Sequence, residues 1–189
     1  MRAVLELEAV RIMPSPATGE AALVSGLRAG DVSAFERLYR EQGPRMKSVA
    51  WNMVGSATDA EDAVQESFLK AYRSMNTFTG QSTLTHWMFR ILVNTCYDIL
   101  RQRRRRQEVD SDAEIRVEPG HTGLRVALER ALERLSLRHR TVFVLFEVEG
   151  YRHNEIAEIL DVPEGTSRSL LFEAKRELRL LLAPAGGAQ

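Results

Sequence analysis

The stretch TLTHWMFRILVNTCYDILRQRRRR, residues 83–106, decides how the rest of the chain is interpreted. Its apolar side chains recur every three or four residues, which predicts an amphipathic helix with a core-facing stripe. That stripe consists of Leu84, Trp87, Met88, Ile91, Leu92, Thr95 and Ile99. A second face carries Arg90, Asn94, Tyr97 and Arg101 at the same spacing, and the basic run Arg103–Arg106 follows.

The side chains of this second face are the types that bind nucleic acid. Arginine and asparagine bond to base edges, a tyrosine ring stacks on an unpaired base, and a run of arginines binds phosphates. A buried helix with a solvated basic end would show the same pattern, so both interpretations stay open at this point.

Charge is distributed unevenly along the chain. The 189 residues carry 26 Lys+Arg and 26 Asp+Glu, so the formal net charge of zero says nothing about a nucleic-acid partner. Five arginines lie in residues 101–106, whereas residues 107–118 hold five acidic side chains and one arginine. The neutral total therefore hides a basic segment beside an acidic one.

The single cysteine, Cys96, excludes an internal disulfide and a cysteine-only metal site, which fits a reducing cytosol. Its place in the central helix favours a small packed side chain over a redox sensor. No apolar run approaches the ~20 residues of a membrane span, and the N-terminus lacks a signal-peptide layout. We therefore expect a cytoplasmic protein without membrane insertion.

Helical periodicity without strand-length alternation predicts an all-α chain of two small helical domains joined by a flexible linker. We expect a flexible N-terminal extension at residues 1–20, a first domain at 21–106, an acidic linker at 107–123, a second domain at 124–182 and a tail at 183–189. Either Met1 or Met13 could begin the native chain. Within the first domain, Gly30-Asp31 is expected to break the helices and Pro44 to lie near a helix start.

A capping-box pattern at residues 58–61 predicts the start of a helix with an acidic and amide-bearing side. Asp62, Gln65, Glu66 and Leu69 share that side. It is either a solvated face or a surface for a basic or polar partner. A polar loop at residues 76–82 then leads into the central helix.

Residues 153–182 predict a short helix, a tight turn and a longer helix, the pattern of a helix-turn-helix. Asp161 and Glu164 have capping-box spacing for the longer helix. Ser167, Arg168, Phe172 and Lys175 are expected on its outer strip. A two-helix corner of any helical bundle would look similar.

Two blocks together resemble a known family. DAEDAVQESFLKAY, followed by F-x-G-x-S and by THWMFRILVNTCYDILRQRRR, resembles the promoter-opening domain of bacterial sigma-70-family factors. Residues 135–178 resemble their C-terminal helix-turn-helix domain. The two domains, joined by a short linker, are similar to the extracytoplasmic-function (group IV) sigma factors. The resemblance covers residues 21–182.

The resemblance implies a specificity subunit of bacterial RNA polymerase, with no cofactor, metal or catalytic site of its own. Its partners would be core RNA polymerase, promoter DNA and an anti-sigma protein. Binding of a flipped base would offset the cost of unstacking it, which is about a few kcal/mol.

The positions that match the family's motifs are implied to make the following contacts. The clamp helices of the polymerase largest subunit would bind Asp62, Gln65, Glu66 and Leu69. The −10 element would contact Asn76, Phe78, Gly80, Arg90, Asn94, Tyr97, Arg101, Arg104 and Arg105. The −35 element would contact His153, Glu164, Thr166, Ser167, Arg168, Phe172 and Lys175.

The expected −35 helix departs from the family pattern. The common form is G-T-V-K-S-R-L-x-R-A-R, and residues 165–175 of this chain read GTSRSLLFEAK. Leu170 and Glu173 replace two basic positions, while Arg168 and Lys175 keep their charge. A carboxylate repels DNA phosphates, so the pattern predicts a different or weaker −35 preference.

Two other functions compete with this one. A stand-alone helix-turn-helix regulator could use Arg168, Phe172 and Lys175, although it would leave the strip of residues 62–69 unexplained. An enzyme is less favoured, because the four histidines are scattered and neither a glycine-rich phosphate loop nor a serine nucleophile elbow is present.

Overall fold

The computed structural model describes residues 17–109 and 123–183. Across these ranges it contains helices and no strand, which confirms the predicted all-α class. The helices are α1 (Ala17–Arg28), α2 (Val32–Val54), α3 (Ala57–Ser74), α4 (Leu84–Val109), α5 (Gly123–Arg134), α6 (Leu137–Phe143), α7 (His153–Leu160) and α8 (Glu164–Leu182). Two short segments, the 3-10 turn η2 (Met75–Thr77) and the π-helical η3 (Val144–Val148), complete the order. The expected tail and most of the expected extension and linker lie outside the described residues.

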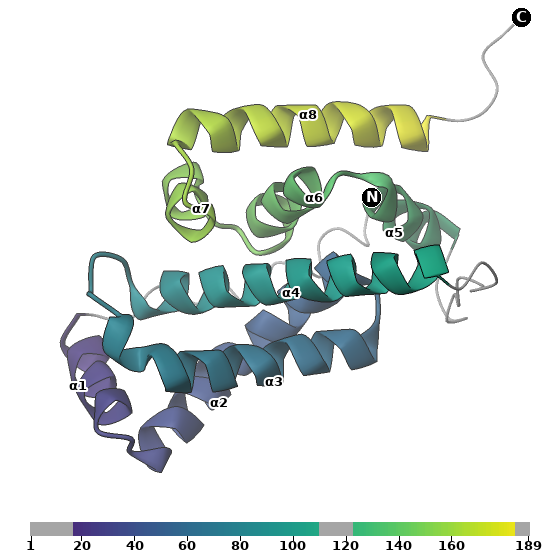
Figure 1. Ribbon diagram of the computed structural model, residues 1–189. Coiled ribbons are helices and arrows are strands. Elements are labelled where there is room, and N and C mark those ends of the chain that lie inside the picture. Colours follow the sequence, from purple (N-terminus) through teal and green to yellow (C-terminus); the bar gives the residue numbers. More distant parts are fainter. Residues whose placement is uncertain (1–16, 110–122, 184–189) are drawn as a thin grey trace, which may run out of the picture.

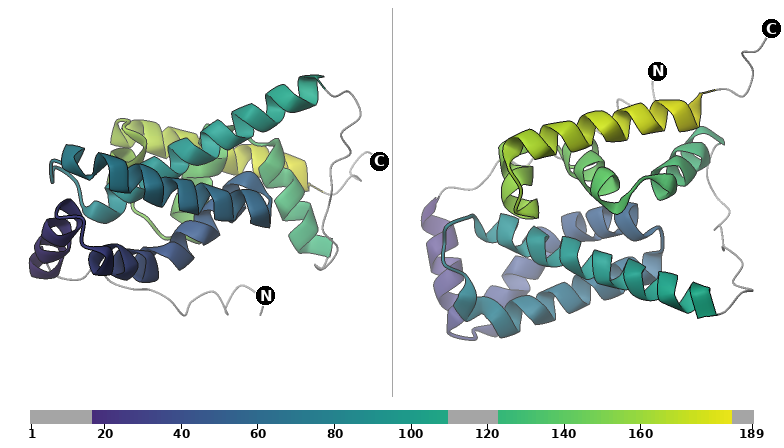
Figure 2. Two further views of the ribbon diagram at one scale, coloured as in Figure 1. Left: turned by 60° about the horizontal axis from the view of Figure 1, so that its bottom comes forward. Right: turned by 45° about the horizontal axis from the view of Figure 1, so that its top comes forward.

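The helices are stacked in layers (Figure 1). Helices α1–α3 form one side, α4 crosses the middle, and α5–α7 separate it from α8, which runs along the opposite side. Both views of Figure 2 show the C-terminal end of α4 extending away from the body. The basic residues at this end are therefore presented on a projecting helix.

The break between α1 and α2 is confirmed at Gly30-Asp31. Gly30 has a φ of 75°, and the Asp31 carboxylate accepts a hydrogen bond of 2.9 Å from the Ser33 backbone N–H as the N-cap of α2. Asp31 therefore caps the first turn of α2.

The expectation for Pro44 is wrong. Pro44 lies inside α2, which continues unbroken to Val54. An interior proline costs about 3 kcal/mol or more because it removes a backbone hydrogen bond. The helix continues through Pro44 because its buried apolar face extends on both sides of it. Leu38 lies on this face before the proline, and Met46, Val49 and Met53 lie on it afterwards.

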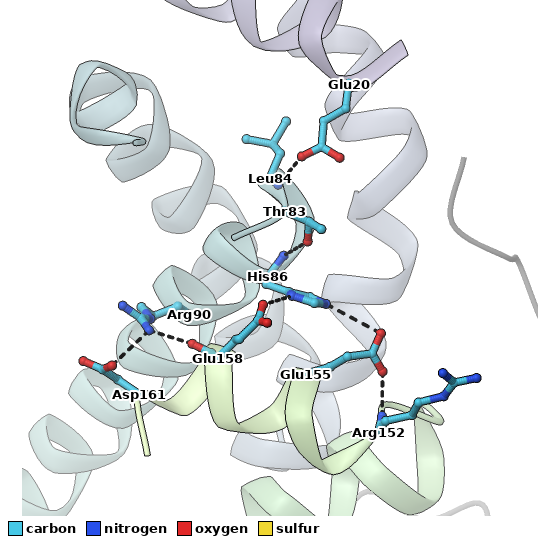
Figure 3. Close-up of polar contacts among 9 residues, drawn as sticks. All are labelled: Glu20, Thr83, Leu84, His86, Arg90, Arg152, Glu155, Glu158 and Asp161. Atoms are coloured by element: carbon cyan, nitrogen blue, oxygen red, sulfur yellow. Dashed lines mark hydrogen bonds and ion pairs between the residues drawn. The ribbon is translucent and has the colours of Figure 1, made fainter. Parts of the chain in front are cut away.

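The start of α4 is fixed by two oxygens. The Glu20 carboxylate of α1 accepts a hydrogen bond of 2.5 Å from the Leu84 backbone N–H, and the Thr83 hydroxyl accepts one of 3.1 Å from His86 N–H (Figure 3). These bonds satisfy donors that the first turn of a helix leaves unpaired. Helix α1 therefore holds the loop and the central helix in register.

The C-terminal domain has the predicted short helix, turn and long helix. The role expected for Asp161 is wrong, however, because it ends α7 in the left-handed conformation (φ 56°) and α8 begins after Pro163. Aspartate is among the few non-glycine residues that adopt this conformation readily. Ser136 caps α6, because its hydroxyl accepts a hydrogen bond of 3.2 Å from the His139 backbone N–H.

One hydrophobic core runs through both domains. Met53 and Phe89 of the first domain belong to the same buried cluster as Val142, Leu145 and Ile156 of the second. A smaller cluster joins α5 to the far half of α8. The two domains are therefore packed against each other, with the second domain covering one side of α4.

Candidate polymerase and nucleic-acid interfaces

The outer face of α3 carries the predicted docking strip, which we define as Asp62, Gln65, Glu66 and Leu69. Three of its side chains are exposed and Glu66 is half-buried. Leu69 is 50% exposed, so it adds an apolar contact to the polar groups of this face. The strip therefore offers two carboxylates, one amide and one apolar contact on a single surface.

Two aromatic residues beside this strip, Tyr39 and Tyr72, were not identified as site residues from the sequence. Both are exposed, at 49% and 58%. Tyr39 packs on Phe68 and Tyr72 packs on Phe35, each with ring centroids 5.0 Å apart. The usable signal was an aromatic pair four residues apart on each of two neighbouring helices. Exposed rings of this kind are typical of protein-binding surfaces.

A groove separates the docking strip from the basic end of α4. Asp62 and Glu66 line its α3 side, and Arg101 and Arg105 line its α4 side. Lys70 spans it, with a hydrogen bond of 3.1 Å to the Thr95 hydroxyl and an ion pair of 3.6 Å with Asp98. The groove thus fixes the spacing between an acidic surface and a basic one.

The loop before α4 exposes some of its predicted contact residues and buries another. Asn76 and Gly80 are exposed, and a Cβ added to Gly80 would meet nothing within 4 Å. Phe78 is 5% exposed and packs on Trp87 with ring centroids 5.4 Å apart. Arg28 holds its backbone carbonyl through a bond of 2.6 Å. In this conformation Phe78 anchors the loop, while Asn76 and Gly80 remain at its surface.

The residues of α4 that were predicted to contact the −10 element differ in their exposure to solvent. Asn94, Arg101, Arg104 and Arg105 are exposed, whereas Arg90 and Tyr97 are half-buried. Arg101 forms an ion pair of 2.5 Å with Asp98. The Tyr97 hydroxyl and the Thr141 hydroxyl of α6 are 2.9 Å apart, and burial raises the pKa of Tyr97, so the phenol stays protonated at neutral pH. Arg90, which donates a hydrogen bond of 2.6 Å to the Glu158 carbonyl of α7, and Tyr97 therefore both contact the C-terminal domain.

The outer surface of α8 differs from the predicted strip at one position. Arg168 is exposed and pairs with Glu164, and Phe172 is 65% exposed. Lys175 is half-buried and forms an ion pair of 2.5 Å with Glu147. Ser167 is fully buried, so its expected place on the outer strip is wrong.

His153 explains the burial of Ser167. Its Nδ1 lies 3.0 Å from the Ser167 hydroxyl, and its ring stacks on Phe146 with centroids 4.6 Å apart. Burial, reinforced by the positive charge of Arg168, lowers the pKa of His153. A neutral imidazole is a weak phosphate ligand, so this side chain positions the start of α8 more than it attracts DNA.

The unusual Glu173 has a partner within the domain. His139 of α6 lies between Glu173 and Glu177, with its Nε2 3.1 Å from the first carboxylate and its Nδ1 3.0 Å from the second. The carboxylate that departs from the basic family pattern is therefore used to hold α8 on α6.

Residues 17–109 and 123–183 hold neither a metal-binding cluster nor a membrane-spanning helix. These ranges contain no group of three or more His, Cys, Asp or Glu side chains placed to hold a metal ion. They also contain no helix with the length and apolar character needed to cross a membrane.

The chain matches two family models. Residues 38–106 match Sigma-70 region 2 and residues 125–178 match Sigma-70, region 4. The first match spans the docking strip, the loop and α4, and the second spans the helix-turn-helix. Because both regions match in one chain, the stand-alone regulator is not favoured.

Similar proteins carry the same assignment. The ECF RNA polymerase sigma-E factor of Haemophilus influenzae is 33% identical over 180 residues, which cover 86% of this chain and 95% of that protein. The ECF RNA polymerase sigma factor SigM of Mycobacterium tuberculosis is 31% identical, with 86% and 84% covered. The solved structure of the sigma factor RpoE in complex with the anti-sigma factor NepR from Bartonella quintana has a TM-score of 0.65 and 27% identity, covering 80% of this chain and 98% of that one. This chain therefore belongs to the extracytoplasmic-function sigma factors of the sigma-70 family.

Proposed function

We propose that this sigma factor docks on core RNA polymerase through the α3 docking strip and its neighbouring aromatic pairs. The observation that carries the proposal is Leu69: an exposed leucine among Asp62, Gln65 and Glu66 makes a surface with both charge and an apolar anchor. Such a mixture is typical of interfaces in which a few central residues supply most of the binding free energy. The match of residues 38–106, which include this strip, to Sigma-70 region 2 supports RNA polymerase as the partner.

Promoter opening is assigned to the loop and to α4. Asn76 and Gly80, which are exposed, would border a flipped base, and the exposed Asn94 and Arg101 would contact the unpaired strand. Arg104 and Arg105 would bind phosphates at the projecting end of the helix. Stacking and pocketing of an unpaired base then offset the unstacking cost of about a few kcal/mol, so no ATP is required.

Recognition of the −35 element is assigned to α8. Arg168 and Phe172 extend outward at its N-terminal half, where a recognition helix contacts base edges. Lys175 and Glu173 are paired with residues of their own domain. The predicted −35 strip therefore offers less positive charge to phosphates than the family pattern does, so its contribution to affinity should be smaller and less dependent on salt.

The wider role follows from the family. The polymerase would supply the catalytic centre, and this chain would act in the cytoplasm as a specificity subunit and not as an enzyme. The Bartonella relative was solved with an anti-sigma factor, which supports a similar inhibitory partner here.

Run-off transcription tests the proposal. Core RNA polymerase is incubated with genomic DNA fragments, with and without the chain. New discrete transcripts that share an upstream two-block motif are expected. If neither transcripts nor binding to core polymerase is observed, the proposal fails.

A further inference from the structure

Helix α8 runs along the outer side of the molecule, and its exposed surface differs from the strip expected from the sequence (Figure 1). Ser167 is buried and Lys175 is half-buried. Between residues 168 and 176 the exposed positions recur three and four residues apart, so they share one face of the helix. This face, which we call the exposed strip of α8, consists of Arg168, Ser169, Phe172, Glu173 and Arg176. A carboxylate is therefore part of the surface that α8 presents to DNA.

The Glu173 side chain is held in place without being buried. Its Oε2 lies 3.1 Å from Nε2 of His139, a residue of α6 whose side chain is only 13% exposed. Glu177 lies on the other side of the same ring, 3.0 Å from Nδ1. The Glu173 side chain nevertheless remains 49% exposed, and its Oε1 accepts no hydrogen bond within the described part of the chain. One oxygen of this carboxylate is thus fixed to the domain, and the other is available to a partner.

The contact with His139 prepares Glu173 for binding. A long side chain loses rotamer freedom when it is immobilised at an interface, and this loss weakens binding. Because His139 already restricts the rotamers of Glu173, less freedom remains to be lost when its carboxylate contacts a base. A carboxylate that is anchored in this way is better suited to base recognition than a fully mobile one.

The chemistry of a carboxylate restricts which base it contacts. An ionised carboxylate only accepts hydrogen bonds. In the major groove guanine presents the acceptors N7 and O6, and thymine presents the acceptor O4 and a methyl group. Adenine presents its N6 amine beside the acceptor N7, whereas cytosine presents its N4 amine without an acceptor next to it. Cytosine is therefore the base that matches Glu173.

Two cations of the exposed strip offset the repulsion between Glu173 and DNA phosphates. Arg176, one turn after Glu173, is exposed and forms no ion pair within the residues that the structure describes. Arg168 lies five residues before Glu173, which is about 7.5 Å along the helix axis. The major groove is about 12 Å wide, so these side chains fit within one segment of it. The arginines can then contact phosphates while the carboxylate faces a base edge.

We propose that Glu173 is a specificity-determining residue that selects cytosine within the −35 element, and that His139 positions its carboxylate. The proposal rests on the assignment of α8 to the −35 element. The common family form has arginine where this chain has Glu173, and arginine matches the O6 and N7 acceptors of guanine. This chain would thus recognise a different base from a factor that keeps the arginine, and a different set of promoters.

Selection from random duplex DNA tests the proposal. Core RNA polymerase carrying the full chain is incubated with a randomised duplex library, and the bound molecules are sequenced. The wild type should select an upstream block in which one position is enriched in cytosine. At that position Glu173→Gln should select adenine, whose N6 and N7 match an amide, and Glu173→Arg should select guanine. The other positions of the block should stay the same.

Binding of defined duplexes measures the size of the effect. Replacement of the selected cytosine by guanine should weaken binding of the wild-type holoenzyme about fivefold or more, and Glu173→Arg should reverse this preference by a similar factor. Glu36→Arg is the matched control, because it makes the same charge change on an exposed residue of α2. It should keep the wild-type preference.

The role of His139 is tested by the same readout. His139→Ala should reduce the preference for cytosine, whereas His139→Gln should keep most of it because its amide can still donate to Glu173. A variant that merely folds less well would bind every duplex more weakly by the same factor. A change confined to one base pair therefore reports positioning of the carboxylate and not stability.

The outcomes separate the proposal from the function on which it rests. If the wild type, Glu173→Gln and Glu173→Arg select the same upstream block, the proposal is overturned while the −35 role of α8 stands. A wild-type preference for any other base than cytosine at the position that changes would also overturn it. If the wild type selects no upstream block, the −35 role itself fails, and base recognition by Glu173 fails with it.

Discussion

Arg140 donates a hydrogen bond of 2.7 Å from Nη1 to the backbone carbonyl of Met53, which lies 87 residues earlier in the chain. Its Nε donates a second bond of 2.7 Å to the carbonyl of Leu132. Met53 lies in the last turn of α2, where carbonyls have no donor within the helix. One buried side chain thus joins the two domains and completes a helix end.

Replacement of Arg140 should therefore destabilise the whole molecule. Arg140→Ala removes two charge-assisted bonds and leaves a buried carbonyl without a donor, so the free energy of unfolding should fall by about 2–4 kcal/mol. Urea denaturation followed by circular dichroism measures the change. The exposed neighbour gives the control, because Arg138→Ala should stay within about 0.5 kcal/mol of wild type. Equal midpoints for the two variants would contradict this account of Arg140.

The Cys96 thiol should be unreactive towards thiol reagents in the native protein. It is fully buried in α4, and burial raises the pKa of the thiol to about 12. Since the thiolate is the reactive form, a disulfide reagent at pH 8 should label the native chain far more slowly than the urea-unfolded chain. Comparable labelling rates would show that Cys96 is exposed by opening of the helix. The expectation of a packed side chain, made from the position of Cys96 in the sequence, is confirmed by its burial.

The sequence predicted the helices of the chain better than it predicted what covers them. Leu84, Met88 and Leu92 were expected in the core and are buried. Phe89 and Val93 lie on a different side of α4 and are also buried, because the C-terminal domain packs there. Helical periodicity predicts which face of a helix is buried, but it does not predict which distant segment packs against the other faces.

The polar contacts between the two domains could not be predicted from the sequence either. Glu149 lies 104 residues from its partner Arg45, and His86 lies 72 residues from Glu158. Isolated charged residues belong to no periodic pattern or motif, so their partners cannot be predicted from a single sequence. For the same reason Arg90 was assigned to DNA from its residue type, while its engagement by α7 emerged only from the fold.

The stability of the C-terminal domain should depend on pH through His153. Burial and the nearby charge of Arg168 lower the pKa of its imidazole below the usual 6.5. The unfolded chain consequently binds a proton more readily than the folded one. This contribution to stability is present above about pH 6.5 and is lost as the pH falls through the folded-state pKa.

Titration of the His153 ring by NMR checks this directly. A midpoint below 6.5 is expected for the wild type, with a rise towards 6.5 in Arg168→Gln. The free energy of unfolding should decline from pH 7 to pH 5 less steeply in His153→Gln than in wild type. A wild-type midpoint at or above 6.5 would show that the ring is solvated and free to contact phosphate.

Loss of the docking strip should weaken binding to core polymerase without unfolding the chain. Gln65→Ala with Glu66→Ala removes two polar contacts, and Leu69→Ala removes the apolar anchor. Each change should reduce affinity about tenfold or more if these residues are central to the interface. Biolayer interferometry with immobilised core polymerase gives the affinity, and circular dichroism verifies the fold. Glu36→Ala, on the exposed surface of α2, is the control and should bind as wild type.

Asn94 gives the cleanest test of strand capture. It is exposed on α4 and belongs to the same face as Arg90, which is also bound to α7. Asn94→Ala should therefore lower the yield of heparin-resistant open complexes while leaving core binding and the radius of gyration unchanged. Arg90→Ala should lower the yield as well, and it also removes the bonds of Arg90 to Glu158 and Asp161 of the C-terminal domain.

Both variants are compared with preformed holoenzyme, where each lost polar contact should lower the yield of open complexes about tenfold. Wild-type yields of open complexes for both variants would remove this face of α4 from promoter melting and leave the loop at Asn76 and Gly80 as the site of strand capture.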